Sequence, residues 1–410
     1  MKTLPDNTVS SSYSAINRSW VSLRNVHELH IELTNVCNLH CSYCYAEVKT
    51  PGKEVPLFDI DTFAIAIERI AEYSRKSHIE LIFHGGEPLL QSDQWYDRAC
   101  TLAVKILGDK GKTVDFGLQS NLTLLNDEHI DVFARHGVKI GTSIDGPEAV
   151  HNQVRGGFKK TIHNLKRLRE RGIFSGAIAV IHLHNWTLVP QIYETFYQLG
   201  ITAFHLNIAS AVGHGIGAKP LSEEQIFRVL KDNLDSLIRY EGSIVETRML
   251  AKIQRHLAAP SAKEFLDQLR CDNPFCHAGI NMIVVKETGE VYPCGCAGSS
   301  GNVQSYLLGN ILDPDGFDPD GWKQKLHGFH GKTDKYEKDC RTCPAKFVCE
   351  HGCPAFDLND SETPENHCGA TKRFERYLRT LPLEAIEQVA QMSPQMAKSK
   401  NAADIITNWQ

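Results

Sequence analysis

The sequence predicts an α/β protein, a partial (β/α)6 TIM-like barrel followed by a cysteine-rich, loop-rich region. From residue 26 to about residue 239, short apolar runs alternate with stretches of helical periodicity. The apolar runs are nearly continuous, which is typical of a parallel sheet covered by helices. Because eight such units would close a barrel, six predict an open one. From about residue 251 this pattern gives way to cysteines and to loops rich in Gly, Asp and Pro.

This pattern divides the chain into four regions. We expect a flexible N-terminal extension over residues 1–26, the barrel over 27–250, the cysteine-rich domain over 251–380 and a C-terminal tail over 381–410. The predicted strands are His27–Leu33, Ile79–Phe83, Val114–Gln119, Val138–Ser143, Ala177–Ile181 and Phe204–Ile208. The predicted helices are Phe63–Tyr73, Ala99–Leu107, Ile130–Arg135, Thr161–Arg171, Val189–Leu199 and Glu223–Tyr240.

Composition and charge exclude several classes of protein. The 410 residues are 42% hydrophobic, carry a formal net charge of −5 and give a pI near 6.4. This balance supplies neither a basic face for nucleic acid nor a polybasic membrane anchor. No apolar run approaches the roughly 18 residues of a membrane-spanning helix. The polar N-terminus has no secretory signal, so thirteen cysteines predict metal or redox ligands in a cytoplasmic protein.

Three cysteines lie directly after the first predicted strand. Cys37, Cys41 and Cys44 have the spacing C-x3-C-x2-C. Three thiolates can hold three irons of a [4Fe–4S] cluster and leave the fourth iron open to a small ligand. A structural zinc ion with His40 as its fourth ligand is the alternative.

Polar segments also follow the next three predicted strands. In His84–Pro88, paired glycines allow a close backbone approach and Glu87 can accept from an ammonium group; a tight turn with an exposed Glu is the alternative. Gln119–Asn121 and Ser143–Pro147 are equally compatible with helix N-caps. Because the carboxyl ends of parallel strands meet at one edge, four polar loops there predict a binding site.

These residues resemble the radical S-adenosylmethionine (SAM) superfamily. The resemblance rests on the three cysteines, on Tyr43 before the third of them, and on the GGEP sequence of Gly85, Gly86, Glu87 and Pro88. It implies that Cys37, Cys41 and Cys44 hold a [4Fe–4S] cluster whose open iron binds SAM, with GGEP on the ammonium group. It also implies contacts from the Tyr43 backbone to adenine, from Asn121 and Ser143 to the ribose or carboxylate, and from Arg155 to the carboxylate. A surface arginine is the alternative for Arg155.

Nine of the thirteen cysteines fall between residues 271 and 368. Eight of them, in the order Cys271, Cys276, Cys294, Cys340, Cys343, Cys349, Cys353 and Cys368, suffice for two four-cysteine sites that hold either [4Fe–4S] clusters or zinc. Of the two cysteines left over, we expect Cys100 to be a small buried helix residue, and Cys296 has no assignment.

This pattern resembles the SPASM domain of peptide-modifying radical SAM enzymes. The spacing C-x12-G-x4-C, then C-x2-C-x5-C-x3-C, then a last cysteine matches that domain, and residues 308–311 (LGNI) resemble its turn. The resemblance implies a small β-hairpin and two auxiliary clusters. Cys271, Cys276, Cys294 and Cys353 would hold the first cluster, and Cys340, Cys343, Cys349 and Cys368 the second.

The resemblance implies reductive cleavage of SAM to a 5′-deoxyadenosyl radical, which abstracts hydrogen from the substrate. An electron donor such as flavodoxin or ferredoxin would supply the first electron. Auxiliary clusters ligated only by cysteine suit electron transfer, which favours a net two-electron oxidation of a peptide or protein side chain. No general base stands out; Asp145, His205 and Asp272 are candidates by position alone.

Two branches of the family match this chemistry. The first cross-links ribosomally made precursor peptides (RiPPs) through cyclophane, carbon–carbon or thioether bonds. Only about 26 residues precede the first predicted strand, so we expect no leader-binding winged-helix domain. The second branch oxidises Ser or Cys of sulfatases to formylglycine, commonly with an Asp base directly after the third SPASM cysteine. Gly295 stands there in this chain, which favours the first branch.

Two readings from other classes explain less of the sequence. A non-catalytic iron–sulfur electron carrier accounts for the cysteines but leaves the GGEP sequence unexplained. A zinc-dependent interaction protein accounts only for the C-terminal cysteines. The glycine-containing loop of residues 207–220 is either a flexible cover of the substrate channel or an ordinary connection.

Overall fold

The computed structural model describes residues 23–46, 48–209, 219–258, 276–299, 303–314, 317–331 and 363–393, together with residues 343, 345, 349, 353 and 355. Strands and helices alternate through the first half: η3 (Leu23–Asn25), β1 (Glu28–Glu32), α1 (Ile60–Tyr73), β2 (His78–His84), η4 (Pro88–Leu90), α2 (Asp93–Asp109), β3 (Thr113–Ser120), α3 (Asp127–His136), β4 (Lys139–Ser143), α4 (Glu148–Val154), α5 (Phe158–Glu170), β5 (Phe174–Ile181), α6 (Val189–Gln198) and β6 (Ala203–Ile208).

The second half begins with helices and continues with short strands. Its elements are α7 (Glu223–Arg239), β7 (Val245–Glu246), α8 (Thr247–Ala258), β8 (Met282–Lys286), β9 (Glu290–Tyr292), α10 (Gly295–Ser299), α11 (Val303–Tyr306), β10 (Gly309–Asn310), α12 (Lys323–Gly331), α14 (Thr363–Leu378) and α15 (Leu383–Ala390).

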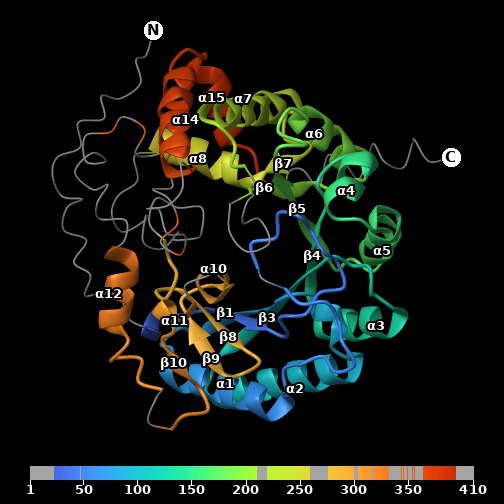
Figure 1. Cartoon of the computed structure of the whole chain (residues 1–410), viewed down its shortest axis with the longest axis vertical. Helices are drawn as coiled ribbons and strands as arrows, with labels where there is room; N and C mark the ends of the chain where they lie inside the picture. Colours follow the sequence, from blue (N-terminus) through green and yellow to red (C-terminus); the bar gives the residue numbers. More distant parts are fainter. Residues whose placement is uncertain are drawn as a thin grey trace.

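One curved sheet organises the molecule. Its strand order is β10-β9-β8-β1-β2-β3-β4-β5-β6-β7, and the strands from β1 to β7 run parallel. The helices of the β/α units lie outside this sheet (Figure 1). The barrel is therefore partial, as the sequence predicts. All six predicted strands are confirmed to within three residues at either end, because each is an apolar run covered by helices.

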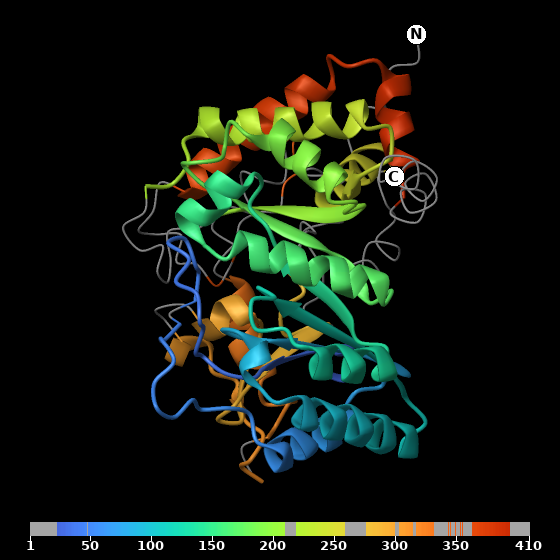
Figure 2. The ribbon, with the colours of Figure 1, turned by 90° about the vertical axis from the view of Figure 1, so that its right-hand side faces the viewer.

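The cysteine-rich half continues the same sheet. Strand β8 pairs with β1 in parallel, with Glu32 opposite Lys286, and then forms an antiparallel hairpin with β9. Gly289 has φ +79°, and a Cβ there would lie 2.6 Å from Asn310 Oδ1, so the hairpin turn needs glycine. The expected small β-hairpin is confirmed. The views in Figures 1 and 2 place α10, α11 and β8–β10 beside β1 at the barrel edge.

Each β1 side chain faces one of two environments. Leu29 and Ile31 are fully buried in the main core, which the outer helices complete. Glu28, His30 and Glu32 alternate with them and face the inside of the curved sheet. A smaller core around Met282, Val284 and Tyr292 lies under the cysteine-rich half.

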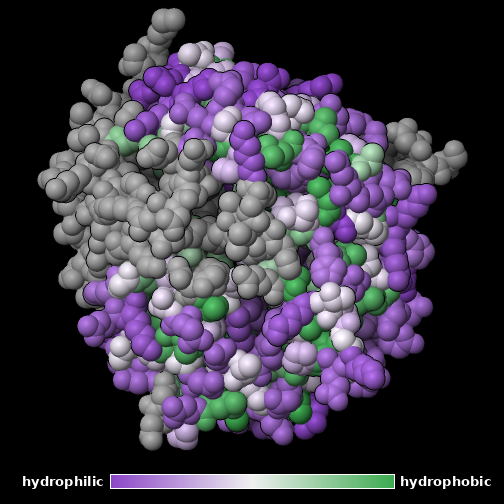
Figure 3. Space-filling view, in the orientation of Figure 1, coloured by the Kyte–Doolittle hydropathy of each residue, from purple (hydrophilic) through white to green (hydrophobic). Residues whose placement is uncertain are grey.

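Helix α4, strand β7 and helix α8 were not predicted from the sequence, and neither were α10, α11, α12 and α14 of the cysteine-rich half. Helix α4 has seven residues and β7 has two, so neither gives a clear periodic signal. The C-terminal helix α15, which follows α14, packs on α8, and α14 packs on α7 (Figures 1 and 2). No helix in the described ranges is both long and apolar enough to cross a membrane. On the face drawn in Figure 3, hydrophobic residues are scattered among hydrophilic ones.

Candidate active site and cluster loops

The three-cysteine loop leaves β1 and is held by the GGEP turn that follows β2. The backbone N–H of Gly86 donates to the Thr34 carbonyl at 2.8 Å, and that of Glu87 donates to the Val36 carbonyl at 2.9 Å. Gly85 has φ +122°, and a Cβ there would lie 2.6 Å from Thr34 O. A Cβ at Gly86 would overlap the Val36 carbonyl. The paired glycines therefore let the chain approach the segment directly before Cys37.

The thiols of Cys37, Cys41 and Cys44 lie within electrostatic range of one another. Cys37 and Cys41 are buried and Cys44 is half-buried. Burial raises the pKa of the Cys37 thiol to about 12, with smaller contributions from Glu87, Cys41 and Cys44. Burial also raises the pKa of Cys41 and of Cys44. Three soft sulfur donors in a desolvated loop suit a metal that keeps them deprotonated.

Zinc fits this loop less well. His40, the expected fourth zinc ligand, is exposed, and its Nε2 lies 2.9 Å from Thr50 Oγ1. Among the residues that the structure describes, no group of three or more His, Cys, Asp and Glu side chains is arranged to hold a single metal ion. An iron–sulfur cluster takes one thiolate per iron, so its ligands need not converge on one point. The donor set therefore fits a cluster.

Glu87 is fully buried, and its carboxylate connects the GGEP turn to the end of β3. Its Oε1 accepts from the Ser120 hydroxyl at 2.7 Å and from the Leu89 N–H at 2.9 Å, and its Oε2 accepts from the Asn121 N–H at 2.9 Å. The exposed turn considered from the sequence is wrong. A carboxylate offers about four acceptor positions, so one stays open for a ligand ammonium group.

Asn121 joins the end of β3 to the cysteine loop. Its Nδ2 donates to Asn38 Oδ1 at 3.0 Å and lies 3.9 Å from Cys37 Sγ, and its Oδ1 accepts from Thr123. Asn121 follows a strand and precedes no helix directly, so the N-cap alternative is wrong for it. Ser143 ends β4, and its Oγ accepts from Gln119 Nε2 at 3.2 Å.

Tyr43 lies in a buried polar network. Its hydroxyl donates to Asp145 Oδ2, and Arg155 Nη2 donates to the same hydroxyl at 2.7 Å. The His182 ring stacks on the Tyr43 ring with centroids 5.2 Å apart. The Arg155 side chain is 11% exposed, so the surface-arginine alternative is wrong. Asp145 also accepts from the Val180 N–H at 3.0 Å, which makes it a structural anchor of the loop.

Four described cysteines of the second half lie together. Cys276, Cys294, Cys296 and Cys353 all belong to the smaller core. The Cys296 thiol contacts those of Cys294 and Cys353, and these contacts together with burial raise its pKa well above the ordinary value. Three of the four expected ligands of the first auxiliary cluster thus share one environment. Cys271 lies outside the described residues.

The expected second auxiliary site is less complete. Cys343 packs against the main core, the Cys349 N–H donates to the Ala345 carbonyl at 2.9 Å, and Cys368 is exposed on α14. Cys340 lies outside the described residues. Cys100 is fully buried in α2, as expected, and burial raises its pKa to about 12.

Glu32 is a buried carboxylate that the sequence did not single out. It ends β1 and is 7% exposed. Its Oε2 lies 3.9 Å from Lys286 Nζ on β8, and its Oε1 lies 3.2 Å from the position of a Cβ built on Gly295. The sequence does contain a feature that marks Glu32: an acidic residue lies between Ile31 and Leu33, at the end of the strand that precedes the three cysteines.

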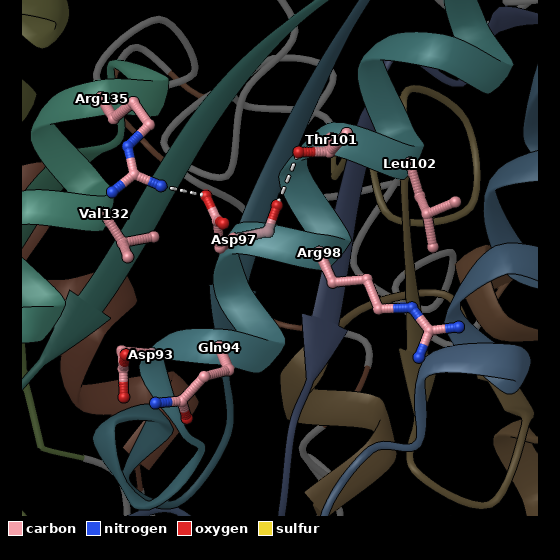
Figure 4. A pocket seen from close by; sticks show the side chains of 8 residues that line it. All are labelled: Asp93, Gln94, Asp97, Arg98, Thr101, Leu102, Val132 and Arg135. Carbon is pink, nitrogen blue, oxygen red and sulfur yellow. Dashed lines mark hydrogen bonds and ion pairs between the residues drawn. The ribbon is translucent and has the colours of Figure 1, made fainter.

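The remaining candidates lie elsewhere. His205 Nδ1 on β6 is 2.5 Å from Thr247 Oγ1, and Asp272 and most of the loop of residues 207–220 lie outside the described residues. A hollow of about 360 Å³ lies between α2 and α3, where Arg135 pairs with Asp97 (Figure 4). It is on the outer helical layer, and none of the candidate residues lines it.

Comparisons with known proteins agree with this geometry. Residues 31–196 match the model of the Radical SAM superfamily. The serine-type anaerobic sulfatase-maturating enzyme of Klebsiella aerogenes is 24% identical over 361 residues, which cover 82% of this chain and 81% of that enzyme.

Solved structures extend the likeness to most of the chain. Native anSMEcpe with bound AdoMet and the Cp18Cys peptide is similar at a TM-score of 0.70 and 19% identity, covering 86% of this chain and 97% of that one. Streptococcus suis SuiB bound to precursor peptide SuiA is similar at a TM-score of 0.59 and 16% identity. The likeness covers 89% of this chain and 83% of the SuiB chain. These likenesses establish the fold. Residues 31–196 therefore form a radical SAM domain.

Proposed function

We propose that this protein is a cytoplasmic radical SAM/SPASM oxidoreductase that modifies a peptide side chain by a net two-electron oxidation. The observation that carries the proposal is the position of the cysteine loop. It leaves the carboxyl end of β1, is held by the GGEP turn, and adjoins the second group of cysteines through the pairing of β1 with β8. Both groups of sulfur ligands therefore serve one edge of one sheet.

Each cofactor has a set of residues suited to it. Cys37, Cys41 and Cys44 would hold the SAM-binding cluster, and Glu87 with the GGEP backbone would take the ammonium group. Asn121 and Ser143 would contact the ribose or carboxylate, and Arg155 would contact the carboxylate. SAM at a reduced cluster supplies a 5′-deoxyadenosyl radical that abstracts a hydrogen atom. The cysteine-rich half would hold two auxiliary clusters, in the ligand sets expected from the sequence.

The side chains beside this loop would orient the cofactor and exclude water. The contacts among Tyr43, Asp145 and Arg155 fix the loop between Cys41 and Cys44, so the loop does not have to be ordered at the moment of reaction. Glu87 is buried and bonded to Ser120 and Asn121, which fixes the distance between the ends of β2 and β3. A preorganised, desolvated pocket of this kind protects a reactive carbon radical from water.

A peptide is the substrate class best supported. Two of the similar solved structures contain a bound peptide, Cp18Cys in one and the precursor SuiA in the other. We place this chain with maturases of ribosomally made precursor peptides, which form an intramolecular cyclophane, carbon–carbon or thioether cross-link. An electron donor such as flavodoxin or ferredoxin would reduce the first cluster.

Formylglycine formation on a sulfatase is the second candidate. The similarity to the Klebsiella aerogenes enzyme over most of both chains favours it. Gly295, which has no side chain where that branch commonly has an aspartate, disfavours it. The two candidates differ in the product, since one joins two residues and the other leaves a carbonyl on one.

Cleavage of SAM tests the core of the proposal. Anaerobically reconstituted enzyme should contain about 12 irons and form 5′-deoxyadenosine from SAM and a reductant. The triple change of Cys37, Cys41 and Cys44 to Ala should abolish 5′-deoxyadenosine and remove about a third of the iron. Cys100→Ala, a buried cysteine in α2, is the matched control and should retain both. Deoxyadenosine formed by the triple variant would disprove the mechanism.

A further inference from the structure

Buried carboxylates in the described part of the chain differ in whether they accept hydrogen bonds. Those less than a tenth exposed are Glu32, Glu87, Asp145, Asp232, Glu246 and Glu375. Five of the six accept at least one hydrogen bond from a side chain or from the backbone, as in the contact of Arg228 Nε with Asp232 at 2.7 Å. Glu32 is the exception, since no donor in the described ranges reaches its carboxylate. Carboxylates this little exposed are usually hydrogen-bonded, so the setting of Glu32, with one long ion pair to Lys286, is unusual.

Lys286 does not donate a hydrogen bond to the Glu32 carboxylate. Its Nζ stands 3.9 Å from Glu32 Oε2, beyond hydrogen-bond distance, and donates to the Gly298 carbonyl. The same ammonium group lies 5.1 Å from the centroid of the Tyr292 ring. Lys286 therefore supplies a positive charge near the carboxylate without occupying its oxygens. Both Glu32 oxygens remain available to accept a proton.

The position of Glu32 places it between the two cysteine groups. It is the last residue of β1, five residues before Cys37, and its side chain faces the inside of the curved sheet. On the neighbouring half, its Oε1 lies 3.2 Å from where a Cβ of residue 295 would stand, directly after Cys294. Tyr45, which follows Cys44, has its hydroxyl 3.5 Å from the same point. One carboxylate thus adjoins both loops that would hold cofactor.

We propose that Glu32 is the general base of the oxidation, taking up the proton that the substrate loses after the first hydrogen atom has been abstracted. This inference rests on the function proposed above. Gly295 and Glu32 act as a pair in it, because the missing side chain at residue 295 leaves the space in which the Glu32 carboxylate lies. The formylglycine branch commonly carries its basic carboxylate on an Asp directly after the third SPASM cysteine. In this chain Glu32, at the end of β1, would supply that carboxylate instead.

The surroundings tune this carboxylate for proton uptake near neutral pH. Burial raises the pKa of Glu32 to about 7, and the charges of Lys286, which lowers it, and Glu287, which raises it, contribute less. His30 on the same strand lowers it slightly. Tyr45 and Tyr292 are the other titratable groups that face it. A base is most effective when its pKa lies near the working pH, so this setting suits general-base catalysis.

The proposed step balances in atoms and electrons. The substrate loses one hydrogen as an atom and a second as a proton with one electron. The proton forms an O–H bond to a Glu32 oxygen, converting the carboxylate to the acid. The electron passes to an acceptor of the iron–sulfur class in the cysteine-rich half. The proton later returns to water, which restores the carboxylate.

The test separates hydrogen abstraction from proton removal. Wild type, Glu32→Gln and Glu32→Asp are incubated anaerobically with SAM, reductant and a candidate precursor peptide, chosen from small reading frames beside the gene. In Glu32→Gln we expect 5′-deoxyadenosine to form as in wild type while the rate of oxidised peptide falls about 100-fold or more. Glu32→Asp keeps a carboxylate and should recover part of that rate. Iron content should be unchanged in both.

Glu28→Gln is the matched control. Glu28 lies on the same strand and the same face, but at the opposite end of β1, bonded to His30 at 2.7 Å. The Glu28→Gln variant should form both 5′-deoxyadenosine and oxidised peptide at wild-type rates. Oxidised peptide formed by Glu32→Gln at the wild-type rate would overturn the assignment of Glu32 alone, and so would a parallel loss of deoxyadenosine and peptide product. A wild-type enzyme that makes deoxyadenosine but never alters the peptide would overturn the proposed function, and this inference with it.

Discussion

Residues of one type acquire different roles here through their partners. Glu32 ends β1 and Glu87 follows β2, and both side chains are buried. Glu87 accepts three hydrogen bonds that tie the turn after β2 to the end of β3, and its backbone N–H donates to the Val36 carbonyl of the cysteine loop. Glu32 accepts none from the described residues and stands 3.9 Å from Lys286 Nζ. The first arrangement fixes geometry, whereas the second leaves a carboxylate able to change its protonation state.

The pH dependence of stability reports on Glu32 directly. Its pKa is about 7 in the folded protein against an ordinary 4.5, so its stabilising contribution is complete below about pH 4.5 and is lost as pH rises through about 7. Glu32→Gln removes this titration. We expect the variant to gain stability relative to wild type across that window, by up to about 3 kcal/mol at the upper end. Denaturant unfolding at several pH values measures it; a constant difference would contradict the assigned pKa.

Arg155 illustrates a buried charge that must stay paired. It contacts Tyr43 and Asp145, and its side chain is 11% exposed. Arg155→Met leaves the buried Asp145 carboxylate without its cation, so we expect a loss of about 3–5 kcal/mol in the free energy of unfolding. Arg135→Met, which breaks an exposed pair with Asp97, should cost less than about 1 kcal/mol. Equal losses in the two variants, measured by denaturant titration, would refute this account.

Among the helices and strands, the sequence predicts those that have an apolar run or a clear hydrophobic periodicity. The six barrel strands and the helices between them have apolar runs or clear periodicity, and the GGEP and cysteine motifs mark two loops at one sheet edge. Helix α4 and strand β7 are too short for such a signal. The proximity of Glu32 to Gly295 could not be predicted, because it depends on β8 pairing with β1 across a long stretch of chain. The buried setting of Arg155 likewise depends on Tyr43, far away in sequence.

The GGEP turn provides a test at this scale. A methyl group on Gly86 would overlap the Val36 carbonyl, so Gly86→Ala must displace the segment that leads into Cys37. We expect it to cost about 1–3 kcal/mol and to lower the iron bound at the first cysteine site. Gly108→Ala, in α2 with nothing within 4 Å of its new methyl group, is the control and should be neutral or slightly stabilising. Full iron content in Gly86→Ala would show that the turn does not position the loop.

Across the whole molecule, the cysteine-rich half contacts the barrel at both ends of its sheet. Strand β8 extends the sheet beyond β1, and α14 packs on α7 at the other end of the barrel (Figure 2). Both groups of cysteines are thereby held on one continuous framework. Such rigid support suits an electron-transfer enzyme, in which the distances among donor, substrate and acceptor must be kept.

The α14 contact can be tested through Phe374, which is fully buried in the main core. Phe374→Ala should lower the free energy of unfolding by about 3–5 kcal/mol, because it leaves a cavity between the C-terminal helices and the barrel. Arg376→Ala, on the exposed side of the same helix, should have little effect. Thermal unfolding of the two variants compares them. Similar melting temperatures would mean that α14 contributes little to the barrel.

The central claim, oxidation of a peptide by radical chemistry, is tested most directly by mass spectrometry. A candidate precursor peptide, chosen from small reading frames beside the gene, is incubated anaerobically with reconstituted enzyme, SAM and reductant. We predict a peptide that has lost two hydrogens and resists fragmentation between two residues, as an intramolecular cross-link requires. Loss of two hydrogens from a single Ser or Cys, with a carbonyl that a hydrazine reagent traps, would move the protein to the formylglycine branch. A peptide of unchanged mass, while 5′-deoxyadenosine accumulates, would contradict the proposed substrate class.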